Sequence, residues 1–305
     1  MQNFIYYNIT PQFLEMENNR FCKEYIPDYF FKSIYQTKKL NLDSRIIFVT
    51  NLDIPKNIIT ELNLTYIKID NDIIDNIKLL KYVLQYYDKR PFRSLTLIRY
   101  ALCEYICDIL KLESFCFIEG DNLIYYNIDN IMDKYCNNTI SVCNMTCKGY
   151  YSSGIFFCNN IPLLKELNDF TCNHIYDQKD QSTTDMNILC KFHTKTHKLS
   201  ILPMLPTDTK DNMLFDAASI GQFLFGENRK RKNSFIDKGH RFYKEFYSKY
   251  NKKFKIYLNN NIYRLEFRNK IYDLFNLHIH NKANFDKAFI FLDEYRNKVN
   301  YFTCV

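Results

Sequence analysis

The sequence predicts an α/β protein built on an open sheet, because short apolar runs alternate with longer segments of helical periodicity. Residues 45–50 (RIIFVT) form a short β-branched, apolar run typical of a buried strand, and 115–119 (FCFIE) predict another. Residues 64–69 (LTYIKI) alternate and predict the strand that follows the first. Two segments between them carry apolar residues at helical spacing: 71–87 and 94–112. This alternation is typical of an open α/β sheet.

Beyond residue 123 strands and helices are less regularly interleaved. We predict strands at 124–128, 139–142 and 155–158, and helices at 161–174 and 184–192. Further on we predict a basic helix at 237–250, a strand pair over 257–267 turning at residues 259–261, and a short strand or loop at 277–280. Gly and Pro are sparse, at 6 and 7 residues of 305, so we expect one domain without a flexible hinge.

The composition excludes a disordered chain, with 47% hydrophobic and 25% charged residues. The net charge of +7 permits a nucleic-acid partner, but the one dense basic cluster is residues 229–232 (RKRK). We interpret the excess as a Lys-rich surface, since abundant Asn, Ile, Lys, Tyr and Phe indicate an AT-rich genome. No nucleic-acid partner is expected.

Eleven Cys are scattered through apolar segments, which predicts free thiols in a reducing compartment. Residues 1–10 do not have the pattern of a signal peptide, and no apolar run is long enough to cross a bilayer. We therefore expect a cytoplasmic protein without a transmembrane segment (in the host cytoplasm if the gene is viral), or one attached to membranes only peripherally.

The most informative segment is 115–129 (FCFIEGDNLIYYNID), where a buried strand leads directly into Glu119, Gly120 and Asp121. In an open α/β sheet ligands bind beyond the carboxyl ends of the strands, and two carboxylates two residues apart project there together. Such hard oxygen ligands suit Mg²⁺ or Mn²⁺, which bridge diphosphates. The alternative is a strand–turn–strand whose turn is merely acidic.

This order of strand, acidic-x-Asp and strand resembles the DxD region of GT-A glycosyltransferases. With Glu119 first and Asn122 after Asp121, it is similar to enzymes of bacteria and large DNA viruses. The resemblance implies a GT-A fold, a Rossmann-like α/β fold with a mixed central sheet flanked by helices. Asp121 would be the principal metal ligand, and Glu119 a second ligand or a holder of the donor ribose. A single GT-A catalytic domain would span 1–305, with a nucleotide-sugar half at about 43–122 and an acceptor half at about 123–282.

Two later blocks extend the resemblance. Residues 151–160 (YSSGIFFCNN) resemble the "FNSG, apolar strand, Asn" block of these families, and Gly154 is the position expected to need close packing or an unusual φ. Residues 183–186 (TTDM) resemble the "D-Q-x-x-L" helix start of the glycogenin-like branch, with Met in place of Gln. Asp185 would then contact sugar. It also suits the first turn of a helix capped by Thr183 or Thr184, and both readings can hold.

Residues 214–226 (LFDAASIGQFLFG) resemble a "FDGAAIGQYLGG" block of the same group, which would turn Asp216 and Gln222 toward the site. Asp216 also stands where it could cap a helix. An inverting transferase needs a carboxylate to take the proton of the acceptor hydroxyl, and Asp216 and Asp185 are the two candidates.

Residues 277–282 (LHIHNK) resemble the C-terminal "H-x-x-x-K" signature of GT-A enzymes. His278 and His280 alternate along an extended segment, so they point to one side, and either would complete the metal shell. Lys282 would hold the pyrophosphate. Arg99 resembles the arginine that leans on the donor phosphate or sugar, the alternative being a surface arginine paired with Glu104 or exposed to solvent.

By fold analogy Thr50 and Asn51 would lie near the nucleotide base. The HxxxH of His193 and His197 lacks the Glu of a metalloprotease, and no Gly-rich phosphate loop occurs.

We therefore predict a metal-dependent, hexosyltransferase-like enzyme using Mn²⁺ or Mg²⁺. It would move a sugar from a nucleotide sugar, by default a UDP-sugar, to a glycan, protein or lipid-linked acceptor. The alternatives are a non-enzymatic nucleic-acid- or glycan-binding protein on a degenerate transferase fold, and a metal-dependent nucleotidyltransferase.

Overall fold

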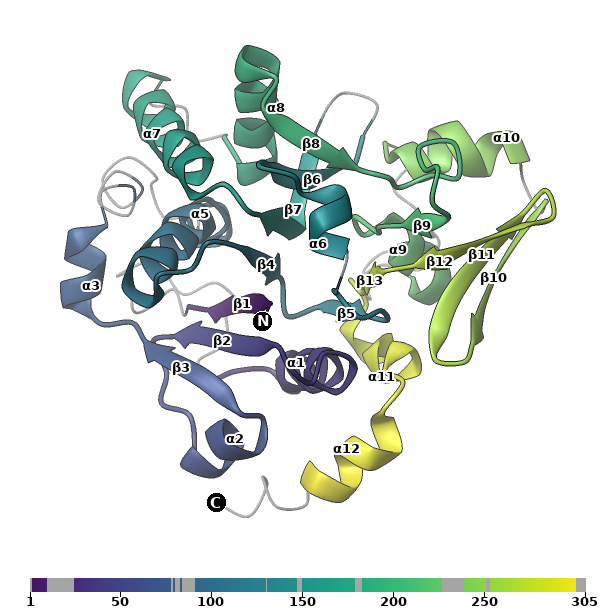
Figure 1. The fold of residues 1–305 in the computed structure, drawn as a ribbon, viewed down its shortest axis with the longest axis horizontal. Helices are drawn as coiled ribbons and strands as arrows, with labels where there is room; N and C mark the ends of the chain where they lie inside the picture. Colours follow the sequence, from purple (N-terminus) through teal and green to yellow (C-terminus); the bar gives the residue numbers. More distant parts are fainter. Residues whose placement is uncertain are drawn as a thin grey trace.

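The chain folds around a seven-stranded mixed sheet (Figure 1). The computed structural model describes residues 2–9, 25–77, 79, 83, 91–129, 131–146, 150–178, 183–226, 239–250 and 253–299. The strand order is β3-β2-β1-β4-β7-β6-β8. The strands are β1 (Asn3–Asn8), β2 (Arg45–Thr50), β3 (Leu64–Lys68), β4 (Phe115–Ile118), β6 (Ile140–Asn144), β7 (Tyr151–Cys158) and β8 (Leu199–Leu202). The first four are mutually parallel, and β7 runs antiparallel to both β4 and β6.

Helices cover both faces of this sheet, which confirms the predicted fold class. They are α1 (Asp28–Leu40), α2 (Lys56–Glu61), α3 (Asn71–Asn76), α5 (Pro91–Leu110), α6 (Ile131–Tyr135), α7 (Ile161–Gln178) and α8 (Asp185–Thr196). Successive side chains of a strand point to opposite faces. Accordingly Phe4 and Tyr6 join the core that contains Ile34 of α1, whereas Ile5 joins the core that contains Leu97 of α5.

A smaller four-stranded sheet, ordered β10-β11-β12-β9, stands beside the central one (Figure 1). Its strands are β9 (Met213–Leu214), β10 (Phe254–Asn259), β11 (Ile262–Phe267) and β12 (Lys270–Leu274). Asn260 and Asn261 both have positive φ, at 50° and 62°, as a tight two-residue hairpin turn requires. The predicted strand pair turning at 259–261 is therefore confirmed.

Two short strands, β5 (Asn122–Ile124) and β13 (Asn276–His278), form a separate antiparallel pair. The remaining helical segments are α9 (Ser219–Phe225), the π-helix η2 (Phe242–Tyr247), α10 (Ser248–Tyr250), the 3₁₀ turn η3 (Lys282–Asn284), α11 (Phe285–Ala288) and α12 (Leu292–Val299). The β5–β13 pair brings the C-terminal part of the chain against the segment that follows β4, and so it positions the site.

Three sequence predictions need correction or completion. The strand expected at 124–128 is β5, which ends at Ile124; beyond it the N–H of Ile128 hydrogen-bonds the Asn41 side chain (2.7 Å) instead of continuing a ladder. The helix expected at 71–87 is α3, which ends at Asn76; most of 78–90 lies outside the described residues, as do residues 229–232 and 237–238. The sequence analysis assigned no strand to β1, although it lies in the middle of the sheet.

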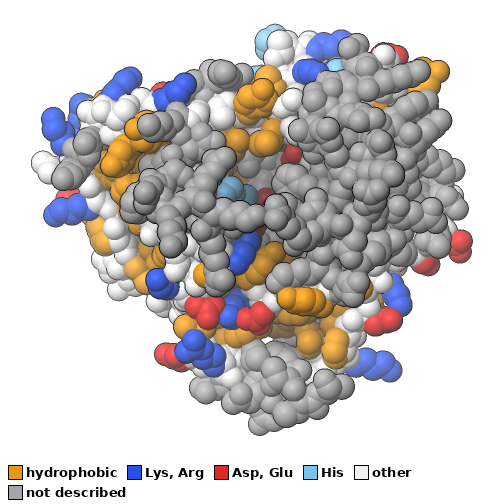
Figure 2. Space-filling view, turned by 180° about the vertical axis from the view of Figure 1, so that it is seen from behind, with side chains coloured by type: hydrophobic (Ala, Val, Ile, Leu, Met, Phe, Trp, Pro, Cys, Tyr) orange, Lys and Arg blue, Asp and Glu red, His pale blue; other side chains and the backbone are white. Residues whose placement is uncertain are grey.

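The eight cysteines in the described part of the chain are all free thiols, as predicted: Cys103, Cys107, Cys116, Cys136, Cys143, Cys158, Cys172 and Cys190. No helix among the described residues is both long and apolar enough to cross a membrane. On the face shown in Figure 2, described Lys and Arg side chains lie at separate places, several of them beside acidic ones. The basic charge on this face is thus distributed among acidic neighbours.

Candidate metal centre

Glu119 and Asp121 lie where the parallel strands of the central sheet end. β1, β2 and β4 end at one edge of the sheet, and Glu119 is the first residue after β4. The Glu119 N–H donates to the Gly154 carbonyl of β7 (2.8 Å), which fixes the start of the turn. Gly120 is required between the two acids, because a Cβ there would lie 2.2 Å from the Phe30 ring.

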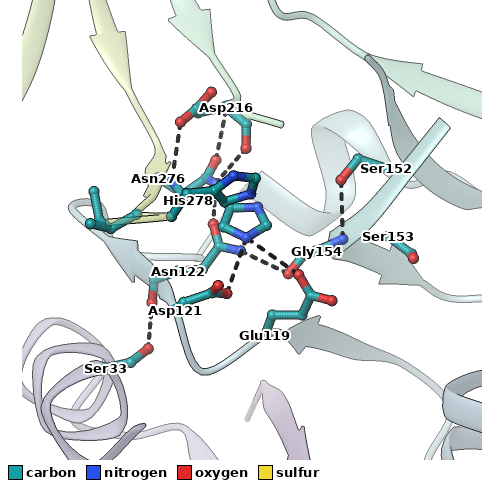
Figure 3. A network of polar contacts seen from close by, with 12 residues as sticks. Ser33, Glu119, Asp121, Asn122, Ser152, Ser153, Gly154, Asp216, Asn276 and His278 are labelled. Atoms are coloured by element: carbon teal, nitrogen blue, oxygen red, sulfur yellow. Dashed lines mark hydrogen bonds and ion pairs between the residues drawn. The ribbon is translucent and has the colours of Figure 1, made fainter. Parts of the chain in front are cut away.

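His278 of β13 completes a cluster with the two carboxylates (Figure 3). One ligand atom from each of Glu119, Asp121 and His278 lies within 4.8 Å of the others. The His278 Nε2 is 3.1 Å from Asp121 Oδ1 and 3.5 Å from Glu119 Oε2. The antiparallel pairing of His278 opposite Asn122 accounts for this approach across more than 150 residues of sequence.

Positive side chains face the carboxylates of this cluster. Lys282 forms an ion pair with Asp121 and also donates to the Ile279 carbonyl (2.7 Å). Burial by itself raises the pKa of the Asp121 carboxyl, but His278 and Lys282 together hold that pKa well below its usual range. Burial by itself lowers the pKa of His278, and the Asp121 carboxylate overcomes this and raises it. The two oxygens of the Asp121 carboxylate are thus each paired with a positive or imidazole partner, Oδ1 with His278 and Oδ2 with Lys282.

The residues present fit a divalent cation. Two carboxylates supply hard oxygen ligands and the imidazole a nitrogen, a set that suits Mn²⁺ and related ions. Gly154 leaves the space that this set needs, since a Cβ there would lie 2.8 Å from Glu119 Oε2 and 2.9 Å from His278 Nδ1. That buried Nδ1 also has no hydrogen-bond partner among the described residues. The close packing predicted for Gly154 is confirmed.

Arg99 lies beneath the cluster in α5 and is only 2% exposed. Its guanidinium donates to Glu119 Oε1 (2.7 Å) and to the carbonyl and hydroxyl of Ser153 (both 2.9 Å). The Asp185 carboxylate, which accepts a hydrogen bond from the Ser153 hydroxyl, lies 3.6 Å from the same guanidinium. Glu104, the alternative partner, instead accepts a hydrogen bond from Asn168 (2.6 Å). Arg99 thus holds the carboxylates of the site in place.

Asp216 is 1% exposed and caps α9 from three residues before its start. Its carboxylate accepts the backbone N–H groups of Ile220 and Gly221 (both 2.8 Å) and of His278 (3.0 Å). Burial raises the pKa of Asp216 even though these three bonds lower it. The carboxylate thus satisfies two first-turn N–H groups of α9, as an N-cap side chain would, although the N-cap residue itself is Ala218. The same carboxylate joins the start of α9 to β13. The two elements approach closely at Gly221 of α9, where an added Cβ would lie 2.1 Å from the carbonyl oxygen of His278 in β13.

The structure places the other predicted site residues further from the three ligand atoms. The His280 ring lies 4.8 Å from that of His278, and its Nδ1 is 2.8 Å from the Gln222 side-chain nitrogen. Burial, and then the proximity of His278, lower the pKa of His280 to about 3. Thr50 ends β2 at the ligand-bearing edge, where its buried hydroxyl accepts the Leu52 N–H (3.2 Å). Asn51 follows it and is half-buried.

Sequence reasoning missed two contributors to this site. Ser153 joins Arg99 to Asp185, and Asn276 hydrogen-bonds both Asn122 and Asp216. The position of Asn276, two residues before a predicted ligand and directly after the apolar pair Leu274 and Phe275, was the available signal for it.

No family model matches the chain, and no curated protein does. Among solved structures it is similar to mouse xyloside xylosyltransferase 1 in its apo form, with 10% identity, 66% of this chain and 85% of that chain covered, and a TM-score of 0.45. An active-site mutant of LgtC gives 12% identity, coverage of 68% and 76%, and a TM-score of 0.44. GlyE of Streptococcus pneumoniae TIGR4 gives 12% identity, coverage of 66% and 46%, and 0.41. All three TM-scores lie below 0.5, so the fold and the site rest on the geometry of this chain alone.

Proposed function

We propose that this protein is a metal-dependent glycosyltransferase that takes its sugar from a nucleotide-sugar donor. The observation that carries the proposal is the cluster of Glu119, Asp121 and His278 at the carboxyl edge of the parallel strands, with Lys282 paired to Asp121. In open α/β sheets this edge is where nucleotides bind. A UDP-sugar is the donor we expect, and a glycan, a protein or a lipid-linked glycan the acceptor.

The three cluster residues would hold Mn²⁺ or Mg²⁺, which when bound supplies positive charge to the leaving diphosphate. Arg99 would hold the Glu119 carboxylate in place through its 2.7 Å bond. Lys282 is 34% exposed at its side chain and pairs with one Asp121 oxygen. It could therefore exchange that carboxylate for a phosphate oxygen of the donor, whose charge is of the same sign.

Of the two carboxylates proposed as the acceptor base, we favour Asp185. Asp216 accepts three backbone N–H bonds, so its carboxylate serves as an anchor for α9 and β13. Asp185 instead bonds a side-chain hydroxyl, Ser153, beside the Arg99 guanidinium. If Asp185 is the base, Asp185→Asn lowers kcat for sugar transfer about 10²–10⁴-fold with little change in donor affinity. A change confined to KM would assign Asp185 to sugar binding instead.

The test of the proposed function is a thermal-shift scan with UDP-, GDP- and CMP-sugars, each with Mn²⁺ and then with chelator. We expect one donor class to raise the melting temperature only with metal, since a ligand that binds the folded state stabilises it. Asp121→Asn should abolish the rise. Asp53→Asn is the matched control, because Asp53 is an exposed carboxylate paired with Lys68 (2.6 Å).

The rival functions give different results when nucleoside triphosphates, an oligonucleotide and a glycan are added to the ligands of this scan. A nucleotidyltransferase would respond to nucleoside triphosphates with metal and not to nucleotide sugars. A binding protein on a transferase fold would respond to an oligonucleotide or glycan in the presence of chelator. Either pattern would refute the proposed transferase.

A further inference from the structure

Two buried asparagine side chains lie directly behind the metal ligands. Asn122 follows Asp121 and begins β5, and Asn276 begins β13 two residues before His278. Both are 0% exposed. A buried amide is costly unless its donors and acceptor are paired, so the partners of these two side chains show what the pair holds together.

The two side chains form a continuous relay of hydrogen bonds (Figure 3). The Asn276 amide nitrogen donates to the Asn122 side-chain oxygen (2.7 Å) and to the Asp216 carbonyl (2.9 Å). Its side-chain oxygen accepts the Asp216 N–H (3.0 Å). At the other end, the Asn122 amide nitrogen donates to the Gly154 carbonyl (3.0 Å).

Both ends of this relay reach the backbone of a metal ligand. The Gly154 carbonyl also accepts the N–H of Glu119 (2.8 Å). The Asp216 carboxylate accepts the N–H of His278 (3.0 Å). The relay therefore links the turn after β4, which carries the two acids, with the strand that carries the histidine.

The backbone ladder that this relay accompanies is short. β5 and β13 pair over three residues each, with one further backbone bond at either end, from the Tyr125 N–H to the Phe275 carbonyl and from the Ile279 N–H to the Asp121 carbonyl (both 2.8 Å). A slip of one residue would turn His278 to the opposite face, away from the acids. The Asn122–Asn276 contact is specific to the observed register, because a slip would separate the two amides.

We propose that Asn276, acting with Asn122, is a positioning residue that sets the metal affinity of the site. The proposal rests on the proposed function in that it takes Glu119, Asp121 and His278 as the ligands. Asn276 touches none of these side chains, and its effect runs through the β5–β13 register and the Asp216 turn.

The test titrates the whole chain with Mn²⁺ and no other ligand. The electron paramagnetic resonance signal gives the concentration of free Mn²⁺, and so the amount bound. We expect Asn276→Ala and Asn122→Ala each to weaken Mn²⁺ affinity about 10–100-fold, as loss of a group that orients ligands does. The double variant should lose little more than the worse single one, because the two side chains act as one relay.

Asn41→Ala is the matched control. Asn41 is likewise buried, at 2% exposed, and its side chain both donates to the Thr37 carbonyl (3.0 Å) and accepts the Ile128 N–H (2.7 Å). We expect it to lower the melting temperature in chelator and to leave Mn²⁺ affinity within twofold of the wild type. If Asn276→Ala does not fold, Asn122→Ala and Asn276→Ser carry the same comparison.

The outcomes separate the two proposals. Suppose that the wild type binds Mn²⁺ and Asp121→Asn does not. If the Asn276 and Asn122 variants then bind Mn²⁺ as tightly as Asn41→Ala does, the positioning role is wrong while the metal site stands. Additive losses in the double variant would likewise contradict a single relay. If the wild type itself binds no Mn²⁺, or Asp121→Asn binds it as well as the wild type, the metal site and the relay's role fail together.

Discussion

Replacing Gly154 by alanine should damage the metal site specifically. A Cβ on this residue would lie 2.8 Å from Glu119 Oε2 and 2.9 Å from both Cε1 and Nδ1 of His278, where ordinary contacts begin at 3.4 Å. Two of the three ligands must therefore retreat by roughly half an ångström, and His278, at 7% exposed, has little room to do so. We expect overpacking to cost about 1–3 kcal/mol of unfolding free energy. Mn²⁺ affinity should fall about 10–100-fold, or about 1.4–2.7 kcal/mol.

Two measurements separate these effects. Urea unfolding in chelator gives the free energy of unfolding, and a titration that follows the electron paramagnetic resonance signal of free Mn²⁺ gives the Mn²⁺ dissociation constant. Gly226→Ala is the matched control, because Gly226 has a φ of +81° and its added Cβ would come no closer than 3.7 Å to another group, the Asn281 side chain. It should lose about 1–3 kcal/mol of stability, because its φ of 81° with a ψ of 172° is a backbone conformation essentially restricted to glycine, and it should keep full Mn²⁺ affinity. A folded Gly154→Ala protein that binds Mn²⁺ like the wild type would refute the assignment of Glu119 and His278 as ligands.

Three further predictions follow from the same contacts. Lys282→Met should strengthen Mn²⁺ binding severalfold in titrations without nucleotide, because Lys282 no longer competes for Asp121. The same variant should weaken metal-dependent UDP binding at least tenfold by calorimetry. If the variant binds both Mn²⁺ and UDP with the affinities of the wild type, the role of Lys282 is contradicted. Arg99→Met leaves Glu119 without its buried partner, so urea unfolding should show a loss of about 3–5 kcal/mol, and a loss below about 1 would contradict the account. Ala218→Gly should raise the unfolding free energy by about 0.5–1 kcal/mol, since Ala218 has a φ of 77° that costs an L-residue roughly 1–2 kcal/mol; a destabilised variant would show that this turn is not strained.

The sequence was most informative where local pattern and burial agree. The run FCFI at 115–118 is apolar throughout and becomes the buried strand β4, with Glu119 directly after it. Gly154 is small at the close approach that the sequence predicted. Thr184 caps α8 by accepting the Asn187 N–H (3.3 Å), as its place before Asp185 indicated. Each of these features is decided within a few residues of chain.

The remaining features depend on contacts between distant parts of the chain. β1 is only six residues long and begins at Asn3, and its strand state depends on pairing with β2 and β4 on either side. The sequence left open which histidine joins the acids, because both lie on one side of an extended segment. The pairing of His278 opposite Asn122 decides it within the structure, since His280 lies beyond the end of β13.

The role of Arg99 likewise depends on tertiary packing. Helical periodicity placed it on α5, and it could not reveal that Ser153 and Asp185, more than 50 residues away, would surround the guanidinium. Asp216 shows the same limit. Its capping role was readable from its place before α9, whereas its bond to the His278 N–H (3.0 Å) comes from a strand 62 residues later.

We propose that Glu119, Asp121 and His278 together bind the divalent cation that a nucleotide-sugar donor uses. An anomalous difference map from crystals of the whole chain soaked in Mn²⁺ and UDP, recorded at the manganese edge, would locate that cation directly. We expect a strong peak bounded by the two carboxylates and the His278 imidazole, with diphosphate density beside it and Lys282 turned from Asp121 toward a phosphate. Manganese bound elsewhere, or a site where His278 and Asp121 keep their 3.1 Å contact without an ion, would contradict it.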